Sequence, residues 1–399
     1  MFYTNLFHTQ LFHTFMFHFK NYSMNNPFVF GKIAGIENFT DRENETAWLI
    51  ERFSVNTNCM LISPRRWGKS SLVKHVAGKM KNTHKEKVFC FIDLYKVRTE
   101  QEFYELFAAE LIKATNNGFE EIVSTAKKVF KQLIPRLSIS PDGNNEVEIG
   151  FAWNDLKKNP SEILNLPETL SKLKKIEIVV CVDEFQNISF FDNPLAFQKK
   201  ARAHWQHHQQ AHYCLYGSKR HLLSEFFTKS SMPFYRFGEI LFLEKIPLPY
   251  WKKFIVKRFA DYKKIISPSQ AEVIASTMEN HPYFVQQFAQ FVWFRTAKTC
   301  TGEIIENALE DLLNQYSILY QKDVDGLTNI QLNFLKALCK KETRFTSAQV
   351  IQDYAIGSSA NIKRIKASLE GKEIIEIWGK SIVFNDPLFE SWLNQKFFI

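Results

Sequence analysis

The sequence predicts an α/β protein with a parallel sheet, followed by an all-helical unit and a small domain of another class. Three observations predict this organisation. Short apolar runs alternate with helical stretches as far as residue 249, which is typical of a parallel sheet covered by helices. Strand signals then stop, and residues 251–322 have helical periodicity. Residues 327–395 finally show three short helical stretches and an alternating hairpin pattern.

Composition and charge limit the classes of protein to which the chain can belong. Its 399 residues correspond to about two to three domains, and the hydrophobic fraction of 45% excludes a disordered or fibrous protein. The net charge of +9 is compatible with a polyanionic partner. No apolar run reaches about 18 residues, so we expect no membrane-spanning helix. The six cysteines show no metal-binding spacing and no secretory signal is visible, which favours a reducing cytoplasm.

The first residues differ in style from the remainder of the chain. Residues 1–23 contain a five-residue repeat built on Leu-Phe-His-Thr and related strings. That period matches neither a helix nor a strand, and the segment lacks the charged start and cleavage site of a signal peptide. We therefore interpret residues 1–26 as a non-functional extension, and we expect Met24 to begin the functional protein.

Residues 27–249 are expected to form the α/β core. After a loop, Thr40 or Asp41 is expected to cap a helix that runs to about Ser54. Apolar runs predict strands at 59–62, 88–94, 176–182 and 212–216, with a fifth at 241–243. Helical periodicity covers 70–81, 100–116, 120–133, 167–174 and 195–210. Residues 137–153 alternate around Asp142-Gly143-Asn144-Asn145, which predicts an inserted hairpin.

Two smaller units are expected after the core. Residues 250–325 are predicted to be helical, and Asp325-Gly326 is a plausible linker. Residues 326–399 then hold helical stretches near 329–340, 346–354 and 358–370. An alternating segment at 374–384 follows, with its turn near Gly379. Three helices and a hairpin make the pattern of a winged helix-turn-helix domain.

A phosphate-binding pattern lies between the first predicted strand and the helix after it. The pattern G-x-x-x-x-G-K-[ST] is met by residues 63–70, except that Ser63 replaces the first glycine. A loop at a helix start directs backbone N–H groups at an anion, and the helix dipole strengthens the attraction. The candidate nucleotide-binding residues are Pro64, Arg65, Arg66, Trp67, Gly68, Lys69, Ser70 and Ser71.

Each residue type in this loop has a physical task. Gly68 permits close approach of the backbone, and Lys69 supplies a charge to the β- and γ-phosphates. The Ser70 hydroxyl is a candidate Mg²⁺ ligand, and Ser71 a candidate contact to the α-phosphate. Trp67 is expected to pack rather than to stack on a base. A chance Gly-Lys-Ser on a basic loop remains the alternative at this point.

Two carboxylates follow the most apolar strand of the chain. The run 178–182 ends in Asp183 and Glu184, and the carboxyl ends of parallel strands are where open α/β sheets bind ligands. Asp183 is expected to hold Mg²⁺, and Glu184 to act as the general base on the attacking water. The strand ending at Tyr216 leads to Ser218, a candidate to position the water or the γ-phosphate, although a plain turn explains it nearly as well.

These segments together resemble a known family. The chain is similar to the AAA-related archaeal and bacterial ATPase-domain family of P-loop ATPases, close to the STAND signalling ATPases, over residues 27–393. The resemblance rests on the loop 64–71 and on Asp183-Glu184-Phe185-Gln186. Weaker support comes from the segments 39–43, 216–218, 233–237, 281–283 and 385–389.

The resemblance implies a fold, a ligand and further site residues. It implies a sheet of order 5-1-4-3-2, a helical lid at 250–325, a C-terminal winged helix, and ATP with Mg²⁺. Asp41, Arg42 and Glu43 are implied on the adenine side of the site, and Pro282 of the lid is implied against the nucleotide. An arginine acting on the γ-phosphate, from this chain or a neighbouring copy, is also implied. Arg236 is the best match, with Arg220 and Arg202 as alternatives.

The winged helix suggests a partner. Its third helix carries Lys363, Arg364 and Lys366, which placed in a major groove would contact phosphates and bases of duplex DNA. Nearby glutamates dilute this charge, and winged helices also bind proteins or other copies of their own chain. We therefore expect an ATP-binding protein, an Mg²⁺-dependent ATPase that acts as a molecular switch coupled to the winged helix. The alternative is a non-catalytic, nucleotide-gated protein-interaction module.

Overall fold

The computed structural model describes residues 26–139 and 147–398, and its centre is a five-stranded parallel sheet. The strands are β1 (Cys59–Ile62), β2 (Lys87–Asp93), β5 (Glu177–Asp183), β6 (Ala211–Gly217) and β7 (Glu239–Phe242). Their spatial order is β2-β5-β6-β1-β7, which confirms the predicted order 5-1-4-3-2 when the five strands are numbered along the chain. The four strands predicted at 59–62, 88–94, 176–182 and 212–216 are present, and so is the predicted fifth strand.

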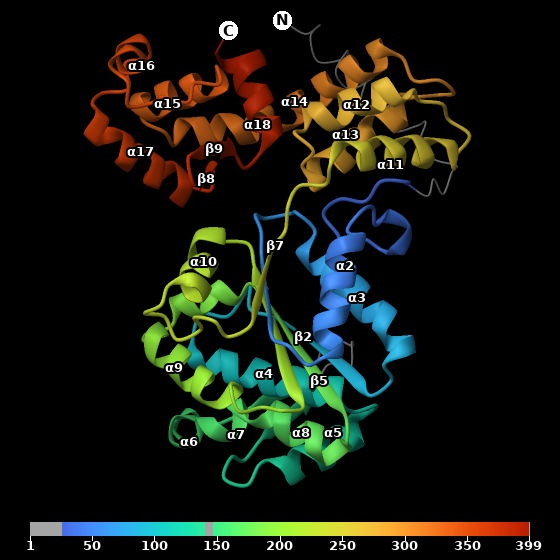
Figure 1. The fold of residues 1–399 in the computed structure, drawn as a ribbon, viewed down its shortest axis with the longest axis vertical. Coiled ribbons are helices and arrows are strands. Elements are labelled where there is room, and N and C mark those ends of the chain that lie inside the picture. Colours follow the sequence, from blue (N-terminus) through green and yellow to red (C-terminus); the bar gives the residue numbers. More distant parts are fainter. Residues whose placement is uncertain (1–25, 140–146, 399) are drawn as a thin grey trace, which may run out of the picture.

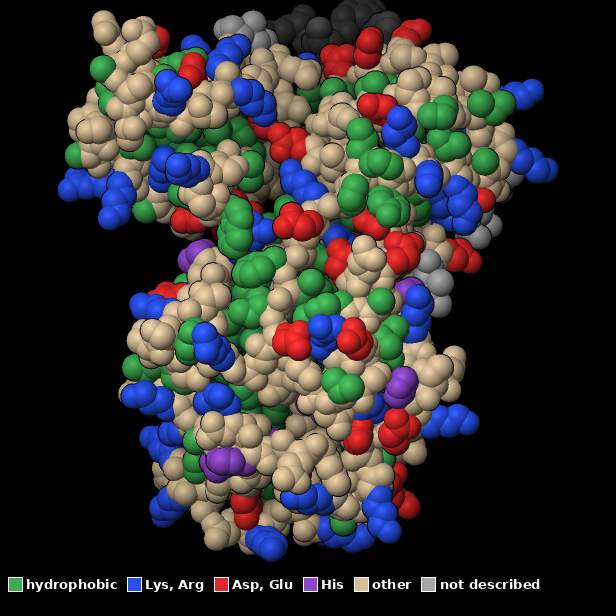
Figure 2. Space-filling view, in the orientation of Figure 1, with side chains coloured by type: hydrophobic (Ala, Val, Ile, Leu, Met, Phe, Trp, Pro, Cys, Tyr) green, Lys and Arg blue, Asp and Glu red, His purple; other side chains and the backbone are tan. Residues whose placement is uncertain are grey.

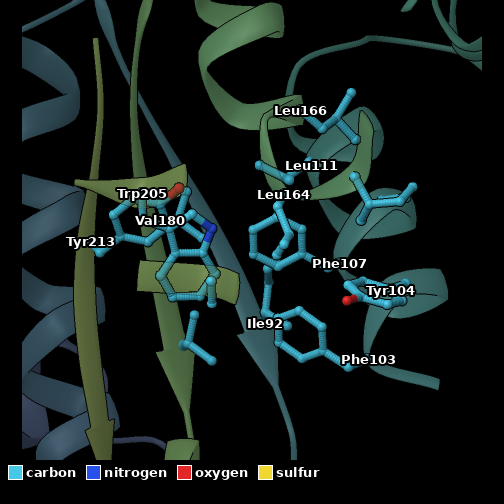
Figure 3. Close-up of a cluster of buried hydrophobic side chains, with 14 of the residues drawn as sticks. Ile92, Phe103, Tyr104, Phe107, Leu111, Leu164, Leu166, Val180, Trp205 and Tyr213 are labelled. Atoms are coloured by element: carbon cyan, nitrogen blue, oxygen red, sulfur yellow. The ribbon is translucent and has the colours of Figure 1, made fainter. Parts of the chain in front are cut away.

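Helices cover both faces of the sheet because alternate strand residues point to opposite sides (Figure 1). On one face lie α2 (Glu43–Ser54) and α3 (Lys69–Thr83). On the other lie α4 (Glu100–Ala114), α8 (Leu166–Lys174), α9 (Pro194–Trp205) and α10 (Arg220–Thr228). Figure 3 shows the core of this second face, where Trp205 stacks on Tyr213 with ring centroids 4.3 Å apart and on Phe107 at 5.8 Å.

An insertion separates α4 from β5. It holds α5 (Phe119–Val129), the antiparallel pair β3 (Arg136–Ile139) and β4 (Val147–Gly150), α6 (Trp153–Lys158) and α7 (Pro160–Leu164). The predicted hairpin is therefore present, although its expected turn at 142–145 lies outside the described residues. The end of the hairpin at 153 was wrong, since Trp153 begins α6. Helices α6 and α7 were not predicted, being too short to show a period.

Several boundaries at the core differ from the prediction. The helix expected to reach residue 210 ends at Trp205, and α5 ends four residues before the expected 133. The predicted N-cap of α2 was wrong: the cap is Arg42 in a left-handed conformation (φ 77°), with no capping side chain. Asp41 precedes it with φ 57°, so the chain enters the helix through two left-handed residues. Helix α10 was not predicted.

The remaining helices form the upper part of the molecule in Figure 1. The segment after the sheet contains α11 (Leu248–Ala260), α12 (Pro268–Thr277), α13 (Pro282–Arg295) and α14 (Gly302–Asp325). The C-terminal segment contains α15 (Asn329–Cys339), α16 (Ala348–Asp353), α17 (Ser359–Gly371), β8 (Ile375–Trp378), β9 (Ser381–Phe384), α18 (Pro387–Trp392) and a short π-helical turn, η3 (Leu393–Phe397). Two 3₁₀ turns, η1 (Ile36–Asn38) and η2 (Phe185–Phe190), complete the described elements.

Three helices and a two-stranded wing confirm the winged-helix prediction. This domain and the helices α11–α14 share one continuous hydrophobic core, which Phe28 of the N-terminal segment joins. They lie together above the carboxyl end of the sheet (Figure 1). Among residues 26–139 and 147–398, no helix is long and apolar enough to cross a membrane. The expected extension 1–26 falls outside the described residues except for Asn26.

Candidate nucleotide-binding site

The loop before α3 is bent by left-handed residues. Gly68, the N-cap of α3, has φ 91°, a conformation that costs glycine nothing and a side chain about 1 kcal/mol or more. Arg66, two residues earlier, is also left-handed, with φ 63°. The first N–H groups of α3, which have no partner inside the helix, consequently face the hollow of the loop. Free N–H groups at a helix start are the geometry that an anion needs.

Lys69 lies at the centre of this loop and is 5% exposed. Its ammonium donates to the backbone oxygen of Pro64 at 2.9 Å and to that of Ser63 at 3.4 Å. Burial lowers the pKa of Lys69 to about 8, and the nearby carboxylates of Asp183 and Glu184 oppose that shift. The lysine is therefore a buried cation held by loop carbonyls, available to anionic oxygens that enter the loop.

Ser63, which stands where the pattern has glycine, fits without strain. It is fully buried, and its hydroxyl donates to the backbone oxygen of Pro64 at 3.0 Å. The hydroxyl therefore satisfies its own hydrogen bond within the loop. The serine at this position is therefore compatible with the conformation of the loop.

Ser70 and Asp183 bring two hard oxygen donors together. Ser70 is the second residue of α3, Asp183 ends β5, and the Ser70 hydroxyl donates to Oδ2 of Asp183 at 2.5 Å. Burial raises the pKa of Asp183 to about 6, although Ser70 and Lys69 favour its charged form. Oxygen donors of this kind suit Mg²⁺, which commonly takes one or two protein ligands and completes its shell with water and phosphate. Within residues 26–139 and 147–398, no group of three or more His, Cys, Asp or Glu side chains could hold a metal ion.

Glu184 and Ser218 meet at the ends of neighbouring strands. Ser218 follows β6, and its hydroxyl donates to Oε2 of Glu184 at 2.8 Å. Glu184 has φ 51°, a left-handed conformation that is strained for a glutamate and that turns the chain sharply after β5. The backbone N–H of Glu184 donates to Oδ1 of Asp183 at 2.8 Å, which fixes the two acids relative to each other.

A cavity of about 510 Å³ unites most of the predicted site residues. Those on its wall are Arg42, Arg65, Arg66, Trp67, Gly68, Lys69, Ser70, Ser71, Glu184, Ser218 and Pro282. Pro64, Asp41, Asp183 and Arg236 do not line it, although Asp183 is bonded to Ser70 on the wall. Apolar side chains, among them Val29, Phe39, Ile246 and Trp251, line it as well. One cavity thus presents both a cationic, oxygen-rich part and an apolar part.

The N-terminal segment is a part of this site that the sequence did not reveal. Residues 29–34 line the cavity, and the Ala34 N–H donates to the Ser71 hydroxyl at 3.0 Å. The Val29 N–H donates to Oε1 of Gln286 on α13 at 2.9 Å, and Arg258 of α11 donates to the backbone oxygen of Pro27 at 2.7 Å. The segment therefore joins the phosphate loop to the helices above it. It has no periodicity, so no local signal could have identified it.

The arginines predicted near the adenine and the γ-phosphate make contacts that the sequence did not indicate. The Arg42 guanidinium is buried and committed, since it donates to Glu45 at 2.7 Å and to the backbone oxygen of Glu244 at 2.6 Å. Arg236 is exposed, has φ 52° and lies over the ring of Tyr235, away from the cavity. Of the two alternatives, Arg202 lies over Phe237. The other, Arg220, lies close to Trp67 of the phosphate loop.

Trp67 packs, as expected, rather than standing free. It is 8% exposed, and its indole meets the His281 ring edge-on at 6.3 Å. Arg66 lies over the ring of Tyr283, with its guanidinium carbon 4.6 Å from the ring centroid. Both contacts join the phosphate loop to α13 and the residue that caps it.

The wing of the winged helix contacts the core beside this cavity. Arg65 of the phosphate loop pairs with Glu373 at 3.2 Å, and Lys219 approaches the same carboxylate at 3.6 Å. Arg220 pairs with Glu376 of β8 at 3.4 Å. A second cavity of about 760 Å³ lies between these surfaces, and Figure 2 shows charged side chains of both signs at the waist between the upper and lower parts.

The basic residues of the winged helix lie on α17. Lys363 and Arg364 are exposed, whereas Lys366 is partly buried and lies over the ring of Phe345 at 5.5 Å. Burial lowers the pKa of Lys366. Two of the three predicted residues are therefore free to meet a partner, and the third partly covers the core of its own domain.

Comparisons with known proteins agree with this description of the fold. A sequence family described as a probable winged helix domain matches residues 318–395. A Walker-type ATPase of Pyrococcus abyssi has a similar structure, with a TM-score of 0.62, 18% identity, and coverage of 90% of this chain and 97% of that one. Two further structures resemble it more distantly. The ORC2 protein of Aeropyrum pernix has a TM-score of 0.47 and 12% identity, with coverage of 94% of this chain and 99% of that one. Cdc6p of Pyrobaculum aerophilum has a TM-score of 0.46 and 12% identity, with coverage of 92% of this chain and 96% of that one. A search of curated protein sequences gives no match.

Proposed function

We propose that this chain binds ATP with Mg²⁺, hydrolyses it, and acts as a switch whose nucleotide state is communicated to the winged helix. One observation carries the proposal: Lys69, Ser70, Glu184 and Ser218 line a single cavity at the carboxyl end of a parallel sheet. These residues come from three separate stretches of chain, yet they converge where the phosphates of a bound nucleotide would lie.

The parts of the cavity match the parts of a nucleotide. Backbone N–H groups of residues 66–71 and the Lys69 ammonium would hold the β- and γ-phosphates. The apolar wall formed by Val29, Phe39 and Ile246 suits a flat, weakly polar base. Ser70 and Asp183 would hold the Mg²⁺, which neutralises charge on the phosphates when bound. The similarity to a Walker-type ATPase of Pyrococcus abyssi supports the same fold.

Hydrolysis follows from the placement of Glu184. A water oxygen bonds to the γ-phosphorus, the bond from that phosphorus to the bridging oxygen breaks, and ADP leaves with the electron pair. Glu184 accepts the proton of the water as general base, and Lys69 stabilises the charge on the transferred group. The Ser218 hydroxyl, now bonded to Glu184, is close enough to this carboxylate to help orient it or the water.

The switch is supported by contacts between the wing and the phosphate site. Arg65 belongs to the phosphate loop, Arg220 follows Ser218 by two residues, and both pair with glutamates at or before β8. A change in either segment on binding or release of the γ-phosphate would alter those pairs. Nucleotide state and wing position are then linked, because each state makes different contacts across this surface.

A variant of Glu184 tests ATP hydrolysis separately from ATP binding. We expect Glu184→Gln to lower phosphate release by about 10²- to 10⁴-fold while a fluorescent ATP analogue binds with unchanged Kd. An unchanged rate in Glu184→Gln would refute the assignment of the base. Retained binding without turnover in the parent protein would instead favour the non-catalytic, nucleotide-gated interaction module.

Duplex DNA is the partner we propose for the winged helix. Lys363 and Arg364 are exposed on α17, the helix that would enter a major groove. We expect Lys363→Glu with Arg364→Glu to weaken duplex binding at 50 mM salt by about tenfold or more, and to reduce its salt dependence. The matched control is Lys127→Glu with Lys128→Glu, an exposed pair on α5, which should not change the affinity. Equal loss in both double variants would indicate nonspecific attraction only, and a partner protein or a second copy of the chain would then be sought.

A further inference from the structure

Gln186 is a buried glutamine whose amide contacts the carboxylate of Glu184. It lies in η2, two residues after Glu184, and is 1% exposed. Its Nε2 donates to Oε2 of Glu184, and the Ser218 hydroxyl donates to that same oxygen. The opposite orientation of the amide would place oxygen against carboxylate, so the hydrogen-bond network assigns Nε2 to this side. Two donors thus converge on one of the two carboxylate oxygens.

The other side of the amide lies against Gly217, the last residue of β6. A Cβ built on Gly217 would overlap Oε1 of Gln186 and lie 3.0 Å from its Cδ. The glycine therefore makes the space that the glutamine occupies. A side chain at 217 and the amide at 186 exclude each other.

The energetics of this position point to a role beyond folding. Among the residues that the structure describes, Oε1 of Gln186 has no hydrogen-bond partner, although it is buried. A buried amide oxygen without a partner is unfavourable, whereas an apolar side chain of the same length would avoid that cost. Within residues 26–139 and 147–398, the hydrogen bond to Glu184 is the only one that this amide makes, and an apolar residue could not replace it.

We propose that Gln186 is a positioning residue for the hydrolysis described above, on which this inference rests. Gln186 holds Oε2 of Glu184, and Oε1 of the same carboxylate remains the oxygen that accepts the proton of the attacking water. Because Ser218 also bonds Oε2, the carboxylate stays fixed through Gln186 when the Ser218 hydroxyl turns toward water or phosphate. Fixing a base within a fraction of an ångström is worth large factors in rate.

Two variants of Gln186 test this role together. Gln186→Leu removes both hydrogen-bonding groups, and we expect kcat to fall about 10- to 100-fold with KM changed less than about threefold. Gln186→Glu keeps the shape: its carboxyl group donates when protonated and repels Glu184 when ionised. The ratio of its kcat to that of the parent should therefore rise as pH falls from 8 to 6, while the ratio for Gln186→Leu stays flat. A purely structural role would not produce that difference.

Two further comparisons make the result specific. Gln198→Leu alters another buried glutamine with an unpartnered oxygen, on α9, and should leave kcat unchanged. Gly217→Ala should lower kcat strongly in the parent and less in Gln186→Ala, since the overlap with the amide is then gone and only the close approach to the Cα of Glu184, at 3.2 Å, remains. Melting temperatures of all variants identify any loss that comes from unfolding.

The outcomes separate this inference from the proposed function. Turnover by the parent that vanishes in Glu184→Gln but is unaffected in Gln186→Leu would overturn the positioning role and leave the ATPase standing. So would a rise in KM with kcat unchanged. If the parent shows no turnover above Glu184→Gln, both fall together, because Gln186 then positions no base.

Discussion

Arg220 lies over the ring of Trp378, with its guanidinium carbon 4.3 Å from the centroid of the indole ring. Arg220 begins α10 of the core, and Trp378 ends β8 of the wing. The same guanidinium carbon lies 5.6 Å from the centroid of the Trp67 ring, and Glu376 pairs with Arg220 at 3.4 Å. A single cation therefore connects the phosphate loop to the winged helix, which gives the proposed switch a physical link.

This link predicts that the wing loosens when the indole is removed. A cation–π contact of this kind is worth about 0.5–1 kcal/mol at a partly exposed site. We expect Trp378→Ala to increase amide hydrogen exchange in β8 and β9 about fivefold, since the ring contact to Phe242 is lost as well. Trp153→Ala is the matched control, because Lys157 lies over that ring at 5.0 Å within the insertion. Equal exchange rates in the wings of parent and Trp378→Ala would show that the contact does not hold the wing.

Lys69 predicts a pH dependence of nucleotide binding. Burial lowers its pKa to about 8, so the free protein loses this charge as pH rises through that value. Phosphate favours the charged ammonium, and binding above pH 8 should therefore take up a proton. We expect the affinity for ATP to fall by up to about tenfold per pH unit between pH 8 and 9.5.

Calorimetry in two buffers of different ionisation enthalpy measures that proton directly. At pH 8.5, the apparent binding enthalpy of ATP should differ between the buffers. Adenosine, which has no phosphate, is the control and should give the same enthalpy in both. A Kd for ATP that is constant to pH 9.5, with no proton uptake, would show that Lys69 does not meet the phosphates.

His212 predicts a loss of stability in mild acid. It lies on β6, is 2% exposed, and burial lowers its pKa to about 4. Lys87 opposes its protonation, whereas Glu177 and Glu168 favour it. Because the folded pKa lies below the value of about 6.5 in the unfolded chain, its contribution is complete above pH 6.5 and is lost toward pH 4. At pH 5 this loss amounts to about 2 kcal/mol.

Urea unfolding at pH 7.5 and pH 5.0 checks this prediction. His212→Gln should lose less free energy of unfolding between the two pH values than the parent does. Glu168 and Glu177, whose pKa values are lowered, lose their contributions only at lower pH and stay ionised at pH 5. The exposed His221→Gln should behave as the parent. An identical pH dependence in His212→Gln would assign the acid sensitivity to other groups.

The phosphate site could be predicted because its signals are local. Gly68-Lys69-Ser70 at the start of a helix and Asp183-Glu184 at the end of an apolar strand each carry their chemistry within a few residues. The sheet order came from the resemblance to a known family, and the structure confirms it. Those two sources named the loop, the acid and the serine that form the phosphate end of the cavity, but fewer than half of the residues that line it.

Contacts between distant residues could not be predicted in the same way. Arg42 was expected beside the adenine, but a backbone oxygen 202 residues later holds its guanidinium. The pair of Arg65 and Glu373 joins residues 308 apart, and no pattern in either segment announces it. The segment 29–34 shows no periodicity and still lines the cavity. Such features depend on how the sheet and its helices pack against the helices of residues 248–398, which sequence periodicity does not describe.

The central claim is that Lys69 serves an active nucleotide site. Phosphate release from ATP with Mg²⁺, measured for the parent, for Lys69→Ala and for the exposed helix variant Lys79→Ala, with and without duplex DNA, tests it most directly. We predict turnover by the parent and by Lys79→Ala, its disappearance in Lys69→Ala, and stimulation by DNA. Phosphate release that is equal in Lys69→Ala and the parent would contradict the account.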